Sequence, residues 1–162
     1  MSAFKSNRVV HEFMQTNPAP PEKVFPLLCP VREAVWLPGW EYQLIHSDSG
    51  VAELGCVFTT PNGDSKGNPT QRVWIATEYD PKAFRIAYVW FDSGVMVSHL
   101  EIRLTAAGPN STHTHIRRTY TTLSPEGNRE LEKYDKAWFE AGMRRWESSI
   151  NHYLTTGAKL AA

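Results

Sequence analysis

The sequence lacks several features that would point to particular classes of function. Its 17 Lys and Arg residues are balanced by 17 Asp and Glu residues, so it has no excess of positive charge for nucleic acid or an anionic membrane. No apolar run approaches the ~20 residues of a membrane-spanning helix, and residues 1–5 do not form a signal-peptide core. We therefore expect no nucleic-acid partner, no membrane span and a cytoplasmic location.

Cysteine is also scarce. Cys29 and Cys56 are the only two, which is too few for a disulfide framework, and their spacing matches no zinc site. Two unpaired thiols suit a reducing compartment. The sequence contains no Gly-x-Ser-x-Gly motif, phosphate loop or dinucleotide fingerprint. We therefore expect no cofactor, and the sequence leaves any catalytic residue unknown.

What is present is enough chain for one domain, residues 1–162, with a sizeable core. A long helix is predicted over residues 125–156. Ser124 suits the N-cap position, Pro125 the first turn and Gly157 the C-terminal stop. The weak point is Gly127, which disfavours the first turn. Residues 158–162 are expected to form a flexible tail.

The apolar face of this helix is unusually broad. At about 100° per residue one arc collects Leu131, Trp138, Phe139, Gly142, Met143, Trp146, Ile150, Tyr153 and Leu154. A single neighbouring helix could not cover so wide an arc. The rest of the chain is therefore expected to build a concave surface around it.

The preceding segments read as strands separated by turns. One strand is predicted over residues 8–14, followed by two short helices near residues 20–25 and 31–36. Six more strands are predicted over residues 41–46, 51–59, 72–79, 84–91, 95–106 and 111–123, with a polar loop over 61–70. Short connections make successive strands neighbours, and a strongly twisted antiparallel sheet curls. The predicted fold class is α+β.

Four segments carry a family resemblance: Pro-Pro-Glu-Lys-Val-Phe at 20–25, residues 29–41, Glu-Tyr-Asp-Pro at 78–81 and residues 151–157. With this order of elements, the chain resembles the START/Bet v1-like helix-grip superfamily (SRPBCC), and within it the polyketide cyclase/dehydrase-like and Hsp90-activator-like bacterial proteins. The resemblance implies a seven-stranded sheet around the C-terminal helix, with a deep apolar cavity between them. It implies no single activity, because members bind lipids, cyclise polyketides or assist chaperones.

Strand alternation predicts which side chains face that cavity. Placing Arg85 outward and pairing Phe91 with Val95 sends inward Phe84, Ile86, Tyr88 and Trp90, then Met96, Ser98, Leu100, Ile102 and Leu104, and finally Thr114, Ile116, Arg118 and Tyr120. For strand 72–79 two registers remain open, with either Trp74, Ala76 and Glu78 or Val73, Ile75, Thr77 and Tyr79 inside. We favour Val73, Ile75 and Thr77, which leaves Trp74 on the outer face.

Arg118 stands out among these residues. A buried guanidinium needs a partner, and the alternatives are an internal salt bridge to Asp135, Glu78 or Glu33, a position at the rim, or a ligand's acid or carbonyl group. The candidate ligand-binding residues are Trp36, Trp40, Tyr88, Trp90, Ser98, Leu100, Arg118, Tyr120, Trp138, Phe139, Gly142 and Trp146.

His113 and His115 form the most metal-like pair in the sequence. Alternation places both on the outer face of their strand, without a further ligand nearby, so we expect solvated histidines and no metal site.

The sequence thus predicts binding of a small, largely apolar or amphipathic molecule between the sheet and the C-terminal helix. One alternative is a polyketide cyclase/dehydratase-like enzyme that uses the same cavity, with Arg118 polarising a carbonyl group and a tyrosine donating a proton. A second is a co-chaperone or interaction module. A homodimer remains open.

Overall fold

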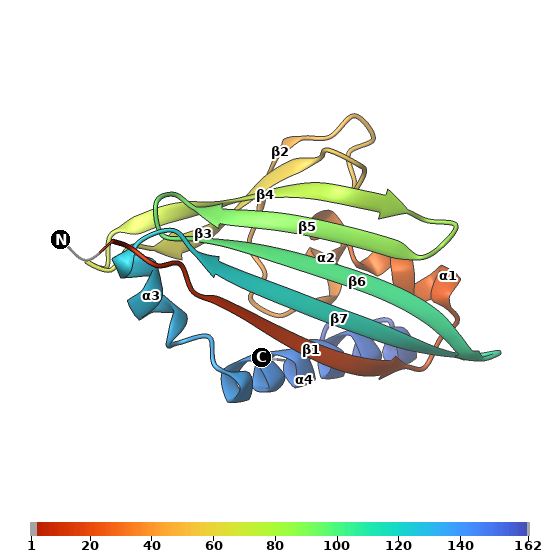
Figure 1. The fold of residues 1–162 in the computed structure, drawn as a ribbon. Coiled ribbons are helices and arrows are strands. Elements are labelled where there is room, and N and C mark those ends of the chain that lie inside the picture. Colours follow the sequence, from red (N-terminus) through yellow and green to blue (C-terminus); the bar gives the residue numbers. More distant parts are fainter. Residues whose placement is uncertain (1–2, 162) are drawn as a thin grey trace.

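The computed structural model describes residues 3–161 and contains one curved antiparallel sheet (Figure 1). The strand order is β1-β7-β6-β5-β4-β3-β2. The strands are β1 Arg8–Asn17, β2 Gln43–His46, β3 Val57–Gly63, β4 Pro69–Asp80, β5 Arg85–Asp92, β6 Met96–Gly108 and β7 Ser111–Thr122. The α+β class and the seven-stranded antiparallel sheet are confirmed.

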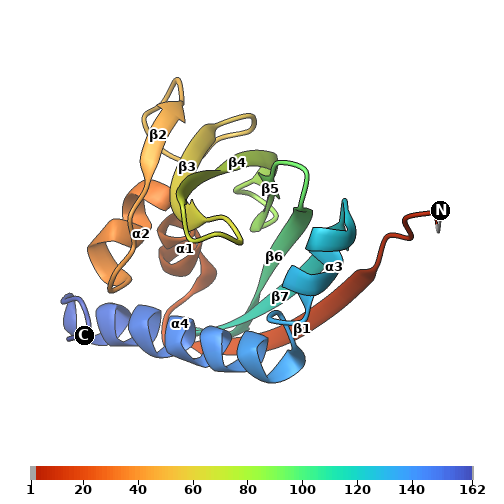
Figure 2. The ribbon, with the colours of Figure 1, turned by 90° about the vertical axis from the view of Figure 1, so that its left-hand side faces the viewer.

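Within residues 3–161, five helical segments accompany the sheet. Between β1 and β2 lie α1 Pro21–Val24, the short 3-10 helix η1 Phe25–Leu27 and α2 Pro30–Trp36; after β7 come α3 Pro125–Leu131 and α4 Lys136–Thr156. Figure 2 shows the sheet curling over α4, which runs beside β1, while α2 lies on the concave side; α1 contacts β6 and β7. Asn151 Nδ2 donates to Thr16 O at 2.9 Å, and Thr16 N donates to Glu147 at 2.8 Å, which ties α4 to the edge strand β1.

The single helix predicted over residues 125–156 is wrong, because the chain breaks between α3 and α4. Asp135 is the N-cap of α4, and its carboxylate accepts a hydrogen bond from Trp138 N at 2.8 Å. Gly127, the expected weak point, lies inside α3, where a Cβ atom would collide with the backbone of Val95. Here glycine permits close approach of α3 to the sheet.

Other strand and loop boundaries differ from the predicted ones for local reasons. Residues 51–56 lie outside any strand, and the predicted polar loop is a β3–β4 hairpin whose turn is held by Asp64, which accepts from Lys66 N and Asn68 N. Phe91 pairs with Val97 rather than with Val95. The shift is two residues, so the inward and outward faces of β6 are those predicted.

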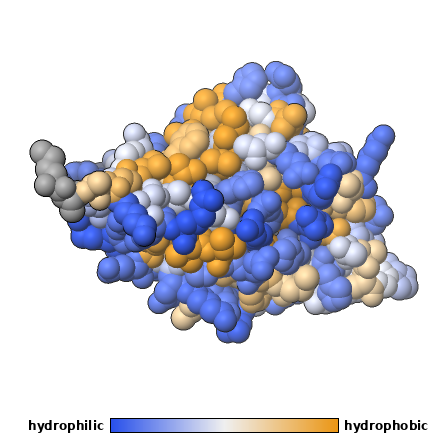
Figure 3. Space-filling view, viewed as in Figure 1, coloured by the Kyte–Doolittle hydropathy of each residue, from blue (hydrophilic) through white to orange (hydrophobic). Residues whose placement is uncertain are grey.

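The favoured orientation of β4 is wrong. Trp74 is buried at 8% exposure and pairs with Trp90, whereas Val73 and Ile75 lie on the outer face. A bulge between Ala76 and Glu78 then changes the alternation. Because Val73 and Ile75 face outward while Trp74 faces inward, β4 is apolar on both faces. Figure 3 shows apolar residues gathered on the outer surface over β3, β4 and β5.

Within α4, Phe139 and Ile150 are buried, but Trp138 is 49% exposed at the edge of the arc. Leu160 and Ala161 lie beside the segment Leu37–Trp40 and α4; Ala162, the end of the predicted tail, lies outside the described residues. Within residues 3–161 no helix is both long and apolar enough to cross a membrane.

Candidate functional site

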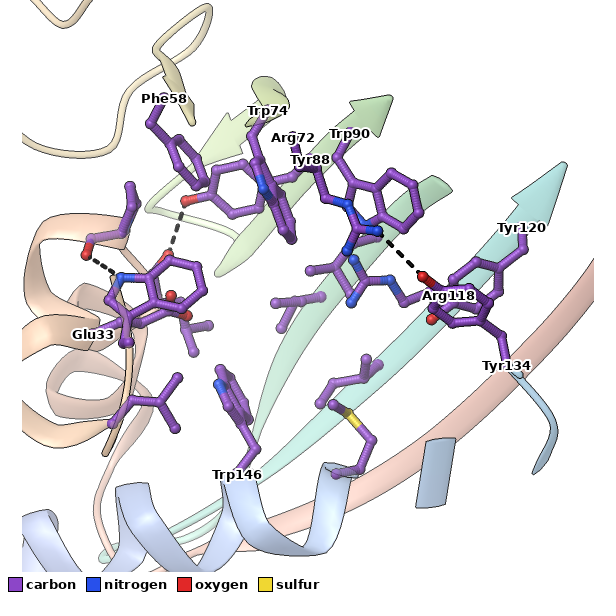
Figure 4. Close-up of a pocket in the computed structure, with 18 of the residues that line it drawn as sticks. Glu33, Phe58, Arg72, Trp74, Tyr88, Trp90, Arg118, Tyr120, Tyr134 and Trp146 are labelled. Carbon is purple, nitrogen blue, oxygen red and sulfur yellow. Dashed lines mark hydrogen bonds between the residues drawn. The ribbon is translucent and has the colours of Figure 1, made fainter. Parts of the chain in front are cut away.

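A cavity of about 230 Å³ lies between the concave face of the sheet, α2 and α4 (Figure 4). Its wall is mostly aromatic and aliphatic, with three ionisable side chains that are carboxyl or guanidinium groups. The lining residues are Leu28, Pro30, Glu33, Leu37, Trp40, Phe58, Arg72, Trp74, Tyr88, Trp90, Leu100, Ile102, Ile116, Arg118, Tyr120, Tyr134, Trp138, Met143 and Trp146.

The aromatic wall is held in place by its own polar atoms. The indole of Trp74 donates to Thr60 Oγ1 at 2.9 Å and stacks on Phe58 with centroids 5.3 Å apart. The Tyr88 hydroxyl donates to Leu28 O at 2.9 Å. Such anchoring leaves the ring faces, rather than their polar edges, toward the cavity.

The structure brings eight of the twelve predicted site residues to this wall. These are Trp40, Tyr88, Trp90, Leu100, Arg118, Tyr120, Trp138 and Trp146. Trp138 stands at the mouth, where its ring meets Tyr134 edge-on at 4.8 Å.

The other four predicted residues lie behind or beside the wall. Trp36 is fully buried and packs edge-on against Trp146 at 5.1 Å, and Phe139 stacks on His11. Ser98 lies beneath Arg118 as a hydrogen-bond acceptor. These three are on the predicted faces of their elements, but neighbouring side chains cover them. Gly142 lines a separate groove that it shares with Trp146 and the segment Leu37–Trp40.

Arg118 points inward from β7, as predicted. Its Nε donates to Ser98 Oγ at 3.1 Å, and the guanidinium lies 5.4 Å from the Trp74 ring and 5.8 Å from the Trp90 ring. Burial lowers the pKa of Arg118, although a guanidinium keeps its charge at neutral pH.

None of the three carboxylates considered for Arg118 forms an ion pair with it. Asp135 caps α4, and Glu78 pairs with Arg85 at 3.2 Å on the outer face. Glu33 lines the cavity but makes no ion pair with Arg118. Among the described residues, Arg118 therefore lacks an internal counter-ion.

Arg72 is a second guanidinium in the wall, which the predicted register of β4 had turned outward. Its Nε and Nη2 donate to the two carboxylate oxygens of Asp92 at 3.0 and 2.8 Å, and Nη2 also donates to the Tyr134 hydroxyl at 3.2 Å. Burial disfavours its charge, but the hydrogen bonds to Asp92 keep the pKa of Arg72 above its usual value. Arg72 is neutralised within the protein.

Glu33, which the sequence analysis considered only as a salt-bridge partner of Arg118, also lines the cavity. Burial raises the pKa of its carboxyl group to about 8, against the opposing effect of Arg118. At neutral pH it is therefore mainly protonated. Pro30, Glu33 and Leu37 share one face of α2 at helical spacing, and all three line the cavity; this spacing was the available signal.

His113 and His115 lie on the side of β7 away from the cavity. His113 is exposed, and His115 Nε2 is 3.3 Å from Glu12. Within residues 3–161 no three His, Cys, Asp or Glu side chains are grouped closely enough to hold a metal ion. The expectation of no metal stays a prediction for elemental analysis.

A curved sheet gripping a helix around an aromatic cavity defines the helix-grip class of fold. No protein-family model and no curated protein sequence matches the chain. Solved structures do match the chain, and three of them match it over most of its length.

Norcoclaurine synthase from Thalictrum flavum in complex with dopamine and hydroxybenzaldehyde is 13% identical, with 93% of this chain and 88% of that chain covered at a TM-score of 0.66. The Zhui aromatase/cyclase from a Streptomyces species is 15% identical, with coverage of 96% and 100% and a TM-score of 0.66. The allergen Ara h 8.0201 is 15% identical, with coverage of 93% and 99% and a TM-score of 0.61. These likenesses show that the chain has the Bet v1-like helix-grip fold.

Proposed function

We propose that the protein binds a small, largely apolar molecule in the cavity between the sheet and α4, and that Arg118 holds an acidic or carbonyl group of that molecule. Arg118 is the observation that carries this proposal. A charged guanidinium on an apolar wall, with one hydrogen bond to a neutral hydroxyl, has donors to spare for a ligand.

The size and lining of the cavity favour a ring-containing ligand. A cavity of ~150 Å³ holds one benzene ring, and this one measures about 230 Å³. The faces of Trp74, Tyr88 and Trp90 supply flat apolar walls. We therefore infer an aromatic or polycyclic molecule of one or two rings, in keeping with the aromatic molecules in the norcoclaurine synthase complex.

Catalysis in the same cavity is the second candidate function. The Tyr120 ring lies 5.7 Å from the Arg118 guanidinium, and burial raises the pKa of its phenol. A neutral phenol beside a fixed cation could protonate a carbonyl group that the cation polarises. A co-chaperone role would need neither Arg118 in the cavity nor its aromatic surroundings.

A cytoplasmic location belongs to the same proposal. Cys29 and Cys56 are both free and buried, which accords with a reducing compartment.

The direct test is a titration of paired acid and carboxamide ligands, naphthoic acid and naphthamide, followed by tryptophan fluorescence. We expect wild-type protein to prefer the acid, and Arg118→Met to erase that preference by roughly 1.5–3 kcal/mol. Arg117→Met is the matched control, because Arg117 lies on the outer face of β7 and pairs with Glu101 at 2.9 Å. Equal binding of acid and amide by wild-type protein would remove Arg118 as the anchor. Native mass spectrometry of protein from its own host would identify a molecule that co-purifies.

A further inference from the structure

The polar atoms of the cavity wall fall into two groups. Several are used within the protein: the indole nitrogens of Trp40 and Trp74 donate to Pro30 O and Thr60 Oγ1, and the Tyr88 hydroxyl donates to a backbone carbonyl. A ligand therefore gains little by approaching them. What matters for recognition is the second group, whose hydrogen-bonding capacity is unused.

That second group includes Arg118 with the adjacent Tyr120 hydroxyl, the indole nitrogen of Trp90, which is buried without a hydrogen-bond partner among the described residues, and Glu33. The carboxyl group of Glu33 makes no hydrogen bond or ion pair with any residue from 3 to 161, although it lines an apolar cavity. When a ligand fills the cavity, this carboxyl group loses contact with water, and a hydrogen bond from the ligand would offset that cost.

Glu33 and Arg118 approach the cavity from different sides. Glu33 extends from α2 and Arg118 from β7, and Figure 4 shows both reaching toward the same space between aromatic rings. Each influences the protonation of the other, yet they form no ion pair. The space between them is therefore available to one molecule that contacts both.

The charges in the wall limit what that molecule can be. Arg72 is neutralised by Asp92 at 2.8 Å, which leaves Arg118 as the cation without a counter-ion among the described residues. Burial raises the pKa of Glu33 to about 8, so its carboxyl group is mainly neutral at pH 7. The complementary ligand carries one negative charge, and its other polar group is uncharged.

We propose that Glu33 is a second anchor of this cavity, and that the ligand is a flat aromatic molecule with a carboxylate at one end for Arg118 and a hydroxyl or carbonyl group at the other end for Glu33. This inference rests on the proposed function, because it assumes the same cavity and the same orientation at Arg118. It narrows the ligand class from aromatic molecules with an acidic or carbonyl group to hydroxy- or oxo-substituted aromatic acids.

Naphthoic acid and its derivative with a hydroxyl group on the far ring test the proposal at pH 7. The hydroxyl group should tighten binding to wild-type protein by about fivefold to tenfold, the value of one neutral hydrogen bond. Glu33→Gln, whose amide can also donate and accept, should keep most of this gain. Glu33→Leu, which has similar volume and no polar atom, should abolish it. Arg117→Met should leave both affinities as in wild type.

The outcomes separate this inference from the proposed function. If the acid binds better than its carboxamide but the far hydroxyl adds nothing, or if its gain survives in Glu33→Leu, the Glu33 anchor is wrong and the Arg118 anchor stands. If acid and carboxamide bind equally, the proposed function fails at Arg118. If a derivative with an ammonium group on the far ring binds better than the hydroxy derivative, Glu33 is ionised in the complex and the neutral pairing is overturned.

Discussion

The guanidinium of Arg72 lies 3.7 Å from the ring centroid of Trp90 and is paired through two hydrogen bonds with Asp92. The side chains of the ion pair are only 17% and 16% exposed. Together the three residues close the part of the cavity next to α3, where Arg72 also reaches the Tyr134 hydroxyl. The pair thus has a structural role, whereas Arg118 has donors available to a ligand.

Removing one partner of this pair should be costly. Asp92→Asn leaves a largely buried guanidinium without its counter-charge, and we expect a loss of about 3–5 kcal/mol in the free energy of unfolding. Arg117→Met, which breaks an exposed pair on the outer face, should cost less than about 1 kcal/mol. Urea denaturation of both variants checks the difference. Equal, small effects would show that Arg72 is satisfied without Asp92.

The two glycines of the C-terminal segments should respond in opposite ways to alanine. A Cβ atom at Gly127 would collide with the backbone of Val95, so Gly127→Ala should destabilise the protein by about 1–3 kcal/mol. At Gly142, inside α4, the nearest atom to such a Cβ is the end of Arg145 at 3.9 Å. Gly142→Ala should therefore stabilise the protein by about 0.5–1 kcal/mol. Thermal unfolding of both variants tests the contrast, and a neutral Gly127→Ala would contradict the close packing of α3 on the sheet.

Much of this architecture could be predicted from alternation and capping signals, because β6 and β7 have outer faces that are more polar than their inner ones and β5 begins with Arg85. The same reasoning failed at β4, where Val73 and Ile75 make the outer face as apolar as the inner one. Because β4 has no polar face to set its register, the favoured register put Trp74 on the outer face, and by alternation Arg72 with it. A bulge at residue 77 cannot be predicted from alternation, since it breaks the alternation itself.

The helix break had a different cause. Asp135 can either sit within a continuous helix or cap a new one, and the local sequence favours neither strongly. Tertiary packing decides: Tyr134 turns inward, where its ring lies 4.9 Å from that of Tyr120 and its hydroxyl accepts from Arg72. These contacts come from residues distant in the sequence, so the segment alone could not indicate them.

Trp146, on the apolar arc of the predicted helix, is partly exposed to the cavity and packs edge-on against Trp36 of α2. Trp36, which is fully buried, should lose about 3–5 kcal/mol on replacement by alanine. Trp146→Ala should cost about half as much, because one side of its ring faces the cavity and has fewer packing contacts to lose. Chemical denaturation checks the order of the two costs. A larger loss at Trp146 than at Trp36 would contradict this packing.

The outer-face histidines give a prediction about metal content. His113 and His115 share the outer face of β7 with no third ligand beside them among the described residues. We expect dialysed protein to contain no stoichiometric zinc or iron by elemental analysis. One metal ion per chain, lost in the His113→Ala/His115→Ala double variant, would overturn this expectation.

The raised pKa of Glu33 should appear in the pH dependence of stability. In the unfolded chain its carboxyl group ionises near the ordinary value of 4.5, and in the folded protein near about 8. Between these values the folded state binds the extra proton, so the free energy of unfolding falls as pH rises through this window and levels off above it. Glu33→Gln has no carboxyl group to ionise. Wild-type protein should therefore lose stability relative to Glu33→Gln from about pH 5 to about pH 8, as measured by urea denaturation across that range.

The same ionisation should weaken the binding of an acidic ligand. Above about pH 8 the ionised Glu33 places a negative charge in the cavity that already receives the ligand's carboxylate, and it competes for the attraction of Arg118. Naphthoic acid should bind wild-type protein less tightly at pH 9 than at pH 6, while Glu33→Gln should bind it equally at both. The neutral carboxamide serves as the control, because its affinity for either protein should not follow this titration. Parallel pH profiles for wild type and Glu33→Gln, in stability and in binding alike, would mean that Glu33 ionises with an ordinary pKa, which removes the reason for matching it to an uncharged ligand group.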